Sequence, residues 1–296
     1  MLNGKKIVPF LLALLLCCSL FSSPSFDKNI AFHYLLEQCD FGPRNPGSVG
    51  HLKTKDYLLD KLSQCTNLVK TQNFVYHDSL NNLDLNLTNI IASFYPQNQK
   101  RVLLCAHWDT RPFADKEPDS TLRDKPILGA NDGASGVAVL LEIANILSKK
   151  EPKYGVDIIF FDGEDWGEEG SDNLCLGSKY FAKNSENYRP QFGILLDMIG
   201  DKDLNIYPER HSFFYARGVV NLVWSKAKKL NLDCFGDSVK HTLIDDHVPL
   251  IEAGIPCIDI IDFDYPWWHT LSDTPDKCSP ESLEKIGKLL IEVLYH

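Results

Sequence analysis

Short apolar runs alternate with longer amphipathic stretches along most of the chain. Runs of this kind are typical of strands that are buried on both faces of a parallel sheet. They span residues 102–106, 156–161, 192–196 and 255–261. In the stretches around them, apolar side chains recur at helical spacing. These predicted helices cover residues 27–40, 51–64, 133–149, 177–184, 212–230 and 280–294.

Two further stretches predict an antiparallel edge of the same sheet. Residues 68–76 alternate polar and apolar side chains, as a strand with one solvated face does, and residues 89–95 are more apolar. A connection of hairpin length joins them. Because the other strands alternate with helices, we expect an α/β fold. Its form is a three-layer sandwich, in which helices flank a central mixed, mostly parallel sheet.

The first 25 residues have the pattern of an export signal. Two lysines precede an apolar run over residues 7–16 that is too short to span a bilayer, and small and polar residues follow it. Cys17 and Cys18 leave a lipoprotein-type signal open as an alternative. No Pro/Gly/Ser-rich linker divides the remainder, so we expect residues 26–296 to form a single domain. The expected location is outside the cytoplasm: secreted, periplasmic or lipid-anchored, with no transmembrane span.

Charge and cysteine content exclude some classes of partner and site. The formal net charge is −10 at pH 7 and no basic cluster is present, which argues against a nucleic-acid partner. Of the nine cysteines, two lie in the signal, and the odd number that remains leaves disulfide pairing open. Cys105 and Cys257 lie in apolar strands and are expected to be buried free thiols. The lack of a Cys-X-X-Cys pair argues against a thiolate zinc site.

An acidic loop ends one of the predicted strands. Glu164 and Asp165 follow Gly163 directly after the apolar run, whereas Glu168 and Glu169 are typical of a solvated turn. In open α/β sheets, the loops at the carboxyl ends of parallel strands form the ligand crevice. The paired carboxylates therefore suggest that one holds a cation while its neighbour moves a proton.

Several other predicted strands end at, or shortly before, a side chain that can bind a metal. Because the carboxyl ends of parallel strands lie on one edge of the sheet, we expect these side chains to converge there. Two histidines and three carboxylates are nitrogen and oxygen ligands of the kind that catalytic zinc takes. The five residues are His107, Asp132, Asp165, Asp197 and His269.

Each residue taken singly has a simpler explanation. Asp132 can cap the helix that follows it, as Asp245 can cap a later short helix. Asp197 can be a turn residue, Trp268 a core aromatic, and His269 a hydrogen-bonded buried histidine. Taken one at a time, these explanations are preferred. The joint placement of the residues after apolar strands favours a metal site.

In order and spacing, these motifs resemble the zinc aminopeptidase superfamily. Within it, three segments are more similar to the animal-type glutaminyl-peptide cyclotransferases (glutaminyl cyclases) and their bacterial relatives. The segments are Leu176 to Tyr180, Asp245 to Pro249, and Trp268 to Thr270. The resemblance covers nearly the whole chain after the signal and is loose only in the first 65 residues.

The resemblance implies a metal site. A single zinc ion would be held by Asp132, Asp165 and His269. Many cyclases have Glu where this chain has Asp165, which is one methylene shorter and keeps the charge.

The resemblance also implies catalytic and substrate-binding roles. Glu164 would be the general acid/base, in a carboxylate hydrogen-bond network with Asp197 and Asp245. Trp268 would line the pocket for the substrate side chain, with Trp166 as a candidate second pocket tryptophan.

The implied reaction converts the N-terminal glutamine of a peptide to pyroglutamate and ammonia. The α-amine attacks the γ-amide carbon of its own residue, zinc polarises the γ-carbonyl as a Lewis acid, and Glu164 moves the proton. The implied partners are peptides or proteins that begin with Gln or Glu, and we expect a monomer. Free α-amines titrate near ~7.7–8.0, so activity should rise toward mildly alkaline pH.

Two other functions remain open. In a two-zinc aminopeptidase, all five ligand positions bind metal, Asp132 bridges the ions and Glu164 activates water. Ligand identity does not separate the two enzymes, and the segments at 245–249 and 268–270 favour the cyclase. A binding ectodomain that has lost its site is disfavoured, because neither a ligand nor the acid/base is missing.

Overall fold

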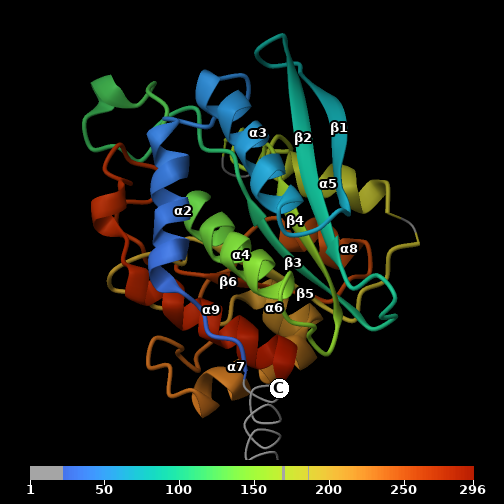
Figure 1. Cartoon of the computed structure of the whole chain (residues 1–296). Coiled ribbons are helices and arrows are strands. Elements are labelled where there is room, and N and C mark those ends of the chain that lie inside the picture. The colour runs from blue at the N-terminus through green and yellow to red at the C-terminus, as the bar shows by residue number, and fades with distance from the viewer. Residues whose placement is uncertain (1–22, 169–170, 186) are drawn as a thin grey trace, which may run out of the picture.

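A six-stranded mixed sheet forms the centre of the computed structural model, which describes residues 23–168, 171–185 and 187–296 (Figure 1). The strand order is β1-β2-β4-β3-β5-β6. β2 pairs antiparallel with both β1 and β4, and the pairs β3–β4, β3–β5 and β5–β6 are parallel. The predicted mixed, mostly parallel sheet with an antiparallel edge is confirmed. The strands are β1 Val69–Asp78, β2 Leu83–Phe94, β3 Arg101–His107, β4 Gly155–Phe161, β5 Gly193–Asp197 and β6 Cys257–Ile261.

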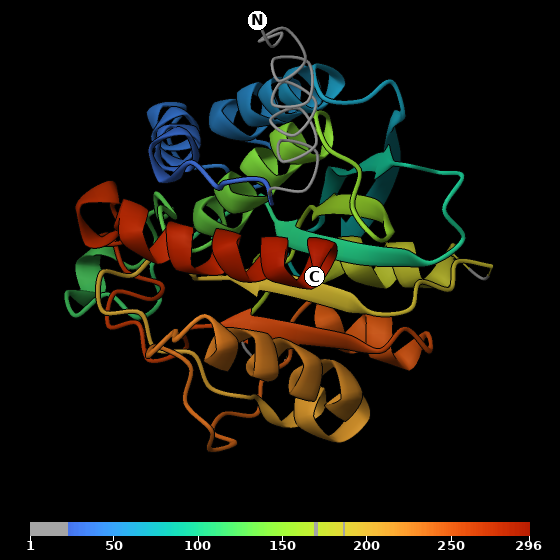
Figure 2. The same ribbon diagram turned by 60° about the horizontal axis from the view of Figure 1, so that its bottom comes forward.

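Helices cover both faces of the sheet, so the three-layer sandwich is confirmed (Figure 2). α2, α3, α4 and α9 lie on one face, α5 and α8 lie on the other, and α6 and α7 pack beside β6. Two short 3-10 helices, η1 and η2, lie in loops. The bounds are α2 Lys28–Asp40, α3 Val49–Ser63, α4 Ala134–Leu147, α5 Leu176–Lys183, α6 Arg210–Tyr215, α7 Arg217–Lys229, α8 His247–Glu252, α9 Pro280–Tyr295, η1 Ser120–Leu122 and η2 Pro275–Lys277.

The two faces of the sheet bury separate hydrophobic clusters. Successive side chains of a strand point to opposite faces. In β3, therefore, Leu104 and Ala106 pack toward α4, and Leu103 and Cys105 pack toward α5 and α8. α4 lies between the sheet and two outer helices, and all but one of its residues are buried. This enclosure explains why its sequence is apolar on almost every side.

Two predicted elements differ from the structure. The helix expected over residues 212–230 is two helices, α6 and α7, which meet at Ala216 with φ −129° and ψ 32°. The apolar pattern runs through the break without interruption, so it does not reveal the turn. β2 begins at Leu83 rather than near residue 89, because it pairs with β1 back to Asp78. Its first residues, Leu83 to Leu87, alternate apolar and polar side chains, and Leu85 and Leu87 are buried, so they have the pattern of a strand with one solvated face rather than of a fully buried strand.

The structure also bears on the cysteines and on the N-terminal segment. All seven cysteines in the described part of the chain are free, and Cys105 and Cys257 are buried as expected. Among the described helices, none has the length and apolar character needed to cross a bilayer. The expected signal over residues 1–25 lies outside the described residues, apart from residues 23–25.

Candidate metal-binding active site

The predicted site residues come together at one end of the parallel strands. His107, the last residue of β3, pairs with Phe161 at the end of β4, and Asp197 pairs with Ile261 at the ends of β5 and β6. This register brings the four strand ends to one level. The loops that follow β4 and β6, and the turn before α4, supply the remaining ligand candidates. They are Asp132, Asp165 and His269, and Glu164 lies directly before Asp165.

Asp132, Asp165 and His269 form a buried group that can hold a metal. The Nε2 atom of His269 lies 3.3 Å from Asp165 Oδ1 and 3.7 Å from Asp132 Oδ2. The other oxygen of Asp165 is buried without a hydrogen-bond partner. A buried carboxylate oxygen with no donor is costly unless a cation satisfies it. The three side chains therefore fit a zinc ion in both donor type and placement.

A second group shares Asp132. The Nε2 atom of His107 lies 3.2 Å from Asp132 Oδ1 and 3.1 Å from Asp197 Oδ1. Asp132 therefore directs one oxygen toward His107 and the other toward His269. This is the arrangement that a carboxylate bridging two ions would have. All five ligand candidates identified in the sequence lie in these two groups.

Buried carboxylates control the protonation of both histidines. Burial opposes the charge of His269, but Asp165 and Asp115 outweigh it and raise its pKa to about 9. Burial also opposes the charge of His107, whose pKa is raised well above its ordinary value by Asp109, Asp132 and Asp197. Because a metal binds only neutral imidazole, zinc must displace these protons.

Two further aspartates hold the backbone of the ligand loops. Asp109 accepts from the backbone N–H of Glu164 at 3.1 Å and of Asp165 at 3.2 Å. Asp273 accepts from the N–H of residue 131 at 2.9 Å and of Asp132 at 3.1 Å. Sequence reasoning missed both residues. Their only signal was an acidic side chain two residues after His107 and four residues after His269.

Arg111 and Asp115 contact the metal-ligand candidates directly, and sequence reasoning assigned them no role. Arg111 Nη1 donates to Asp165 Oδ1 at 2.8 Å, and Arg111 Nε donates to Asp115 at 2.9 Å. Asp115 Oδ1 lies 3.1 Å from His269 Nδ1, which orients the ring so that Nε2 faces the ligand group. Both residues lie in the loop over residues 108–128, at the end of the sheet where β3 ends (Figure 1).

Glu164 lies beside the ligand group in an acidic environment. Burial and the charges of Asp245 and Asp165 raise the pKa of Glu164 well above its ordinary value. The thiol of Cys175 lies 3.5 Å from Glu164 Oε1. Cys175 has a left-handed backbone (φ 55°), and its N–H donates to the carbonyl of Glu164 at 2.9 Å. The start of α5 therefore fixes the acidic loop.

A cavity of about 250 Å³ opens over these groups. Acidic residues and His269 line it together with several apolar side chains. Trp268 lines the cavity and packs against the ring of His269, with the ring centroids 4.0 Å apart. The other apolar lining residues are Leu174, Met198, Leu243, Ile244, Ile261 and Phe263. Asp197 and Asp245 also line this cavity, so it gathers the predicted catalytic residues and the three predicted single-zinc ligands, whereas His107 is not among its lining residues.

Trp166 is the one predicted site residue that lies elsewhere. Its indole N–H donates to Asp78 Oδ2 at 2.9 Å, and the ring packs with Leu85, Leu87 and Leu176. It is not among the residues that line the cavity. Trp166 therefore anchors the acidic loop to the β1–β2 hairpin in this structure.

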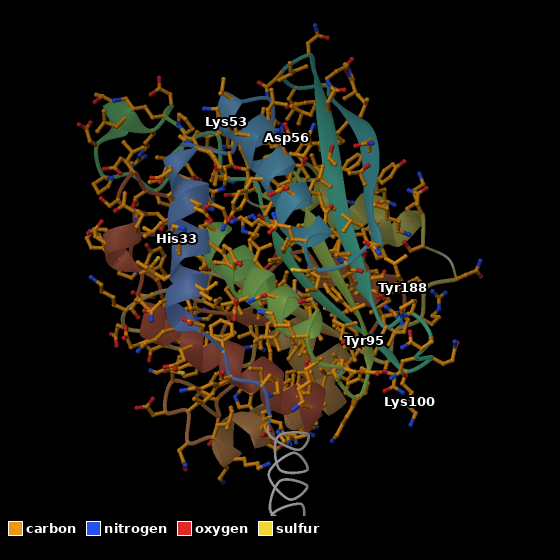
Figure 3. The ribbon with its side chains drawn as sticks, viewed as in Figure 1. His33, Lys53, Asp56, Tyr95, Lys100 and Tyr188 are labelled. Atoms are coloured by element: carbon orange, nitrogen blue, oxygen red, sulfur yellow. The ribbon has the colours of Figure 1, made fainter. Side chains whose placement is uncertain are left out.

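A larger cavity, of about 770 Å³, lies at the opposite end of β3 and β4. Tyr95, Lys100 and Tyr188 mark that end of the sheet in Figure 3. Two of its charges, the half-buried Arg101 and the buried Asp157, bind each other. It contains none of the metal-ligand candidates, so its size does not make it a candidate for the chemistry.

Comparison with known proteins assigns the chain to a family. Residues 89–294 match the sequence profile described as peptidase family M28. The chain belongs to peptidase family M28. This is a zinc-dependent family, in agreement with the two ligand groups. The superfamily suggested by the sequence motifs is therefore confirmed.

Relatives in the family include both cyclases and peptidases. A glutaminyl-peptide cyclotransferase of Drosophila melanogaster is 26% identical over 261 residues, or 78% of this chain and 70% of the fly protein. A crystal structure of Bacteroides thetaiotaomicron glutaminyl cyclase is 39% identical with a TM-score of 0.89, covering 93% of this chain and 99% of that one. A Zn-dependent exopeptidase from Parabacteroides distasonis is 38% identical with a TM-score of 0.89, covering 93% and 100%. The predicted similarity to glutaminyl cyclases is confirmed, whereas an animal-type assignment is not.

Proposed function

We propose that this M28 protein is a glutaminyl-peptide cyclotransferase, which converts the N-terminal glutamine of peptides and proteins to pyroglutamate with release of ammonia. The observation that carries the proposal is the cavity over Asp132, Asp165 and His269, which Glu164 and Trp268 also line. The similarity to solved bacterial glutaminyl cyclases over nearly the whole chain supports it. We further propose that residues 26–296 are the exported catalytic domain.

The proposed reaction needs a bent substrate and one proton carrier. The apolar wall that includes Trp268 holds the glutamine side chain folded back, so that the α-amine faces its own γ-amide carbon. Glu164 takes a proton from the attacking nitrogen and delivers it to the departing amide nitrogen. Zinc held by Asp132, Asp165 and His269 supplies Lewis-acid polarisation of the γ-carbonyl. Because ring formation is intramolecular, the pocket removes much of the entropic barrier.

Asp197 and Asp245 complete the proposed acid/base group. Asp245 offers an oxygen in the same cluster as Glu164 and Cys175. Burial and the charge of Asp197 raise the pKa of Asp245 to about 6. We assign these two residues to the network that positions Glu164, and Trp268 to the substrate pocket.

One observation favours a second candidate, a two-zinc aminopeptidase. Asp132 directs an oxygen to each ligand group, as a bridging ligand would. In that case Glu164 would activate water, and the product would be a free N-terminal amino acid.

The deciding experiment incubates the purified chain with a peptide that begins with glutamine, and measures ammonia, peptide mass and bound zinc. The cyclase predicts ammonia release, a peptide lighter by one ammonia, and about one zinc per chain. Glu164→Gln should remove the activity and keep the zinc, whereas Glu168→Gln, an exposed carboxylate of the same loop, should leave the rate unchanged. Free amino acids with about two zincs per chain would replace the cyclase with the peptidase.

A further inference from the structure

A buried polar cluster lies behind the cavity and has no part in the reaction described above. Asp259 sits in the middle of β6, between isoleucines, and is fully buried. Its face of the strand is also the face of Cys257, toward α5 and α8. His247, the first residue of α8, and Glu209, which precedes α6, are buried beside it. An ionisable residue in the centre of an apolar strand is expensive and requires partners.

Asp259 and Asp245 are two neighbouring buried carboxyl groups whose oxygens largely lack hydrogen-bond donors. Both oxygens of Asp259 and the Oδ2 atom of Asp245 lack a hydrogen-bond donor among the described residues. Ligand atoms of Asp245, His247 and Asp259 all lie within 4.8 Å of one another. Two ionised carboxylates so placed would repel each other strongly, whereas one shared proton satisfies both. Burial, followed by Asp245 and Asp197, raises the pKa of Asp259 well above its ordinary value, in agreement with this arrangement.

Glu209 and His247 lie next to Asp259 and are bound to each other. His247 Nε2 lies 2.9 Å from Glu209 Oε1, so the opposite ring nitrogen, Nδ1, faces Asp259 Oδ2 at 4.0 Å. Glu209 also accepts from the backbone N–H of His211 and of Ser212. The Ser212 hydroxyl in turn accepts from the N–H of Asp259 at 2.9 Å. The ring of His247 and the backbone of Asp259 are therefore fixed through one connected network.

We propose that Asp259 is a positioning residue of the active site, which shares one proton with Asp245 and so fixes the Asp245 carboxyl beside Glu164. The proton stays within the pair, so the pair carries one negative charge toward Glu164 instead of two. The inference rests on the proposed function for its effect on rate, but the shared proton itself does not. The charged groups that face the pair are His107, Glu164, Asp197, Glu209, Asp246 and His247.

Infrared spectroscopy of the purified protein at neutral pH tests the shared proton without any substrate. The spectrum of the wild-type protein should contain one protonated-carboxyl band that is absent from the spectrum of Asp259→Asn. The same band should be absent from the spectrum of Asp245→Asn. Asp157→Asn is the matched control, because Asp157 is also a buried strand aspartate but forms an ion pair with Arg101. The control should keep the band. An unchanged band in Asp259→Asn would overturn the proposal.

Kinetics then test the positioning role. The amide of Asp259→Asn can still donate to Asp245, so we expect kcat to fall about 10-fold with KM within about twofold. Asp259→Leu leaves Asp245 without a partner, and kcat should fall about 100-fold, with zinc content unchanged. Asp157→Asn should keep kcat once its melting temperature confirms folding. Equal kcat in wild type and a folded, zinc-loaded Asp259→Leu would contradict the proposal.

Two further outcomes are distinguishable. A metal equivalent that is lost from both His247→Gln and Asp259→Asn but retained in Asp157→Asn would make the cluster a cation site, and would overturn the shared proton. If wild type releases free amino acids instead of ammonia, the proposed function fails. The infrared result still decides whether Asp245 and Asp259 share a proton, and peptidase kinetics replace cyclase kinetics in the second test.

Discussion

The two ends of the parallel strands differ in whether their buried carboxylates have hydrogen-bond donors. At the amino end, Arg101 binds Asp157 through two hydrogen bonds of 2.8 and 2.6 Å, and Ser93 and Tyr188 donate to the same carboxylate. At the carboxyl end, Asp165 and Asp245 each keep a buried oxygen without a donor.

The comparison shows that cavity size and chemical function do not coincide in this molecule. The larger cavity lies over charges that are already satisfied, and the smaller one lies over carboxylates that still need a cation or a proton. Buried polar atoms without partners cost free energy, so they persist where they serve a function. The unsatisfied end is therefore the candidate for the chemistry.

The largest expected effect comes from Asp132→Asn at the unsatisfied end. This substitution removes a ligand from both groups, so bound zinc should be lost and activity should fall at least about 10³-fold, because a metal Lewis acid supplies several kcal/mol. The metal-free variant should be no less stable than metal-free wild type, since one of several crowded carboxylates is neutralised. Zinc analysis, kinetics and urea unfolding measure the three quantities. If metal-free Asp132→Asn were much less stable than the metal-free wild type, the carboxylates at this end would not be the crowded, unsatisfied charges described above.

Acid unfolding should show that the ionised carboxylate of Glu209 is stabilised by its hydrogen-bond partners. Burial opposes its ionisation, but His247 and Ser212 lower its pKa to about 2 from an ordinary value of 4.5. The unfolded chain therefore binds the proton first as pH falls. The stabilisation, at most about 3 kcal/mol, is complete above about pH 5 and is lost as pH falls toward 2.

The check is urea unfolding of wild type and Glu209→Gln across that range. The glutamine variant should be less stable near pH 6 and should lose less stability on acidification. Parallel curves for the two proteins would show that Glu209 gains nothing from its partners.

At the amino end, Arg101→Met should reverse the pattern expected of Asp132→Asn. It leaves Asp157 buried without its ion-pair partner, and we expect a loss of about 2–4 kcal/mol in the free energy of unfolding. The value of kcat/KM in the folded variant should stay within about twofold of wild type. Thermal melts and steady-state kinetics provide the measurements. A tenfold loss of kcat/KM at unchanged zinc content would mean that this end also serves the reaction.

The smallest expected effect separates the two tryptophans near the acidic loop. Trp268→Ala removes an aromatic wall of the cavity, so KM for the glutamine peptide should rise about 10-fold, as for about 1.4 kcal/mol of lost contact. Trp166→Phe removes the hydrogen bond to Asp78 and part of the ring's packing, and the hydrogen bond alone should cost about 1 kcal/mol of stability, with KM unchanged. Equal KM increases in both variants would return Trp166 to the substrate pocket.

Much of the fold could be predicted because each element carries its own periodicity. The break at Ala216 could not be predicted this way, because the apolar spacing continues through it. The early start of β2 was missed although Leu83 to Leu87 alternate apolar and polar side chains, because this segment is less apolar than the rest of the strand. The role of Asp259 could not be predicted for a similar reason, because one acidic residue in an apolar run does not change the periodicity of the run.

The sequence by itself determined the convergence of His107, Asp132, Asp165, Asp197 and His269. Parallel strands place their carboxyl ends at one edge, so it was sufficient that His107 and Asp197 end strands, that Asp165 and His269 follow strands, and that Asp132 precedes a helix beside them. Only the tertiary structure decided which atoms face each other. Asp132 is shared between two ligand groups, Arg111 and Asp115 orient the ligands, Trp166 turns away, and Asp245 meets Asp259. These are contacts between side chains from distant segments, and their geometry depends on the packing of loops that have no period of their own.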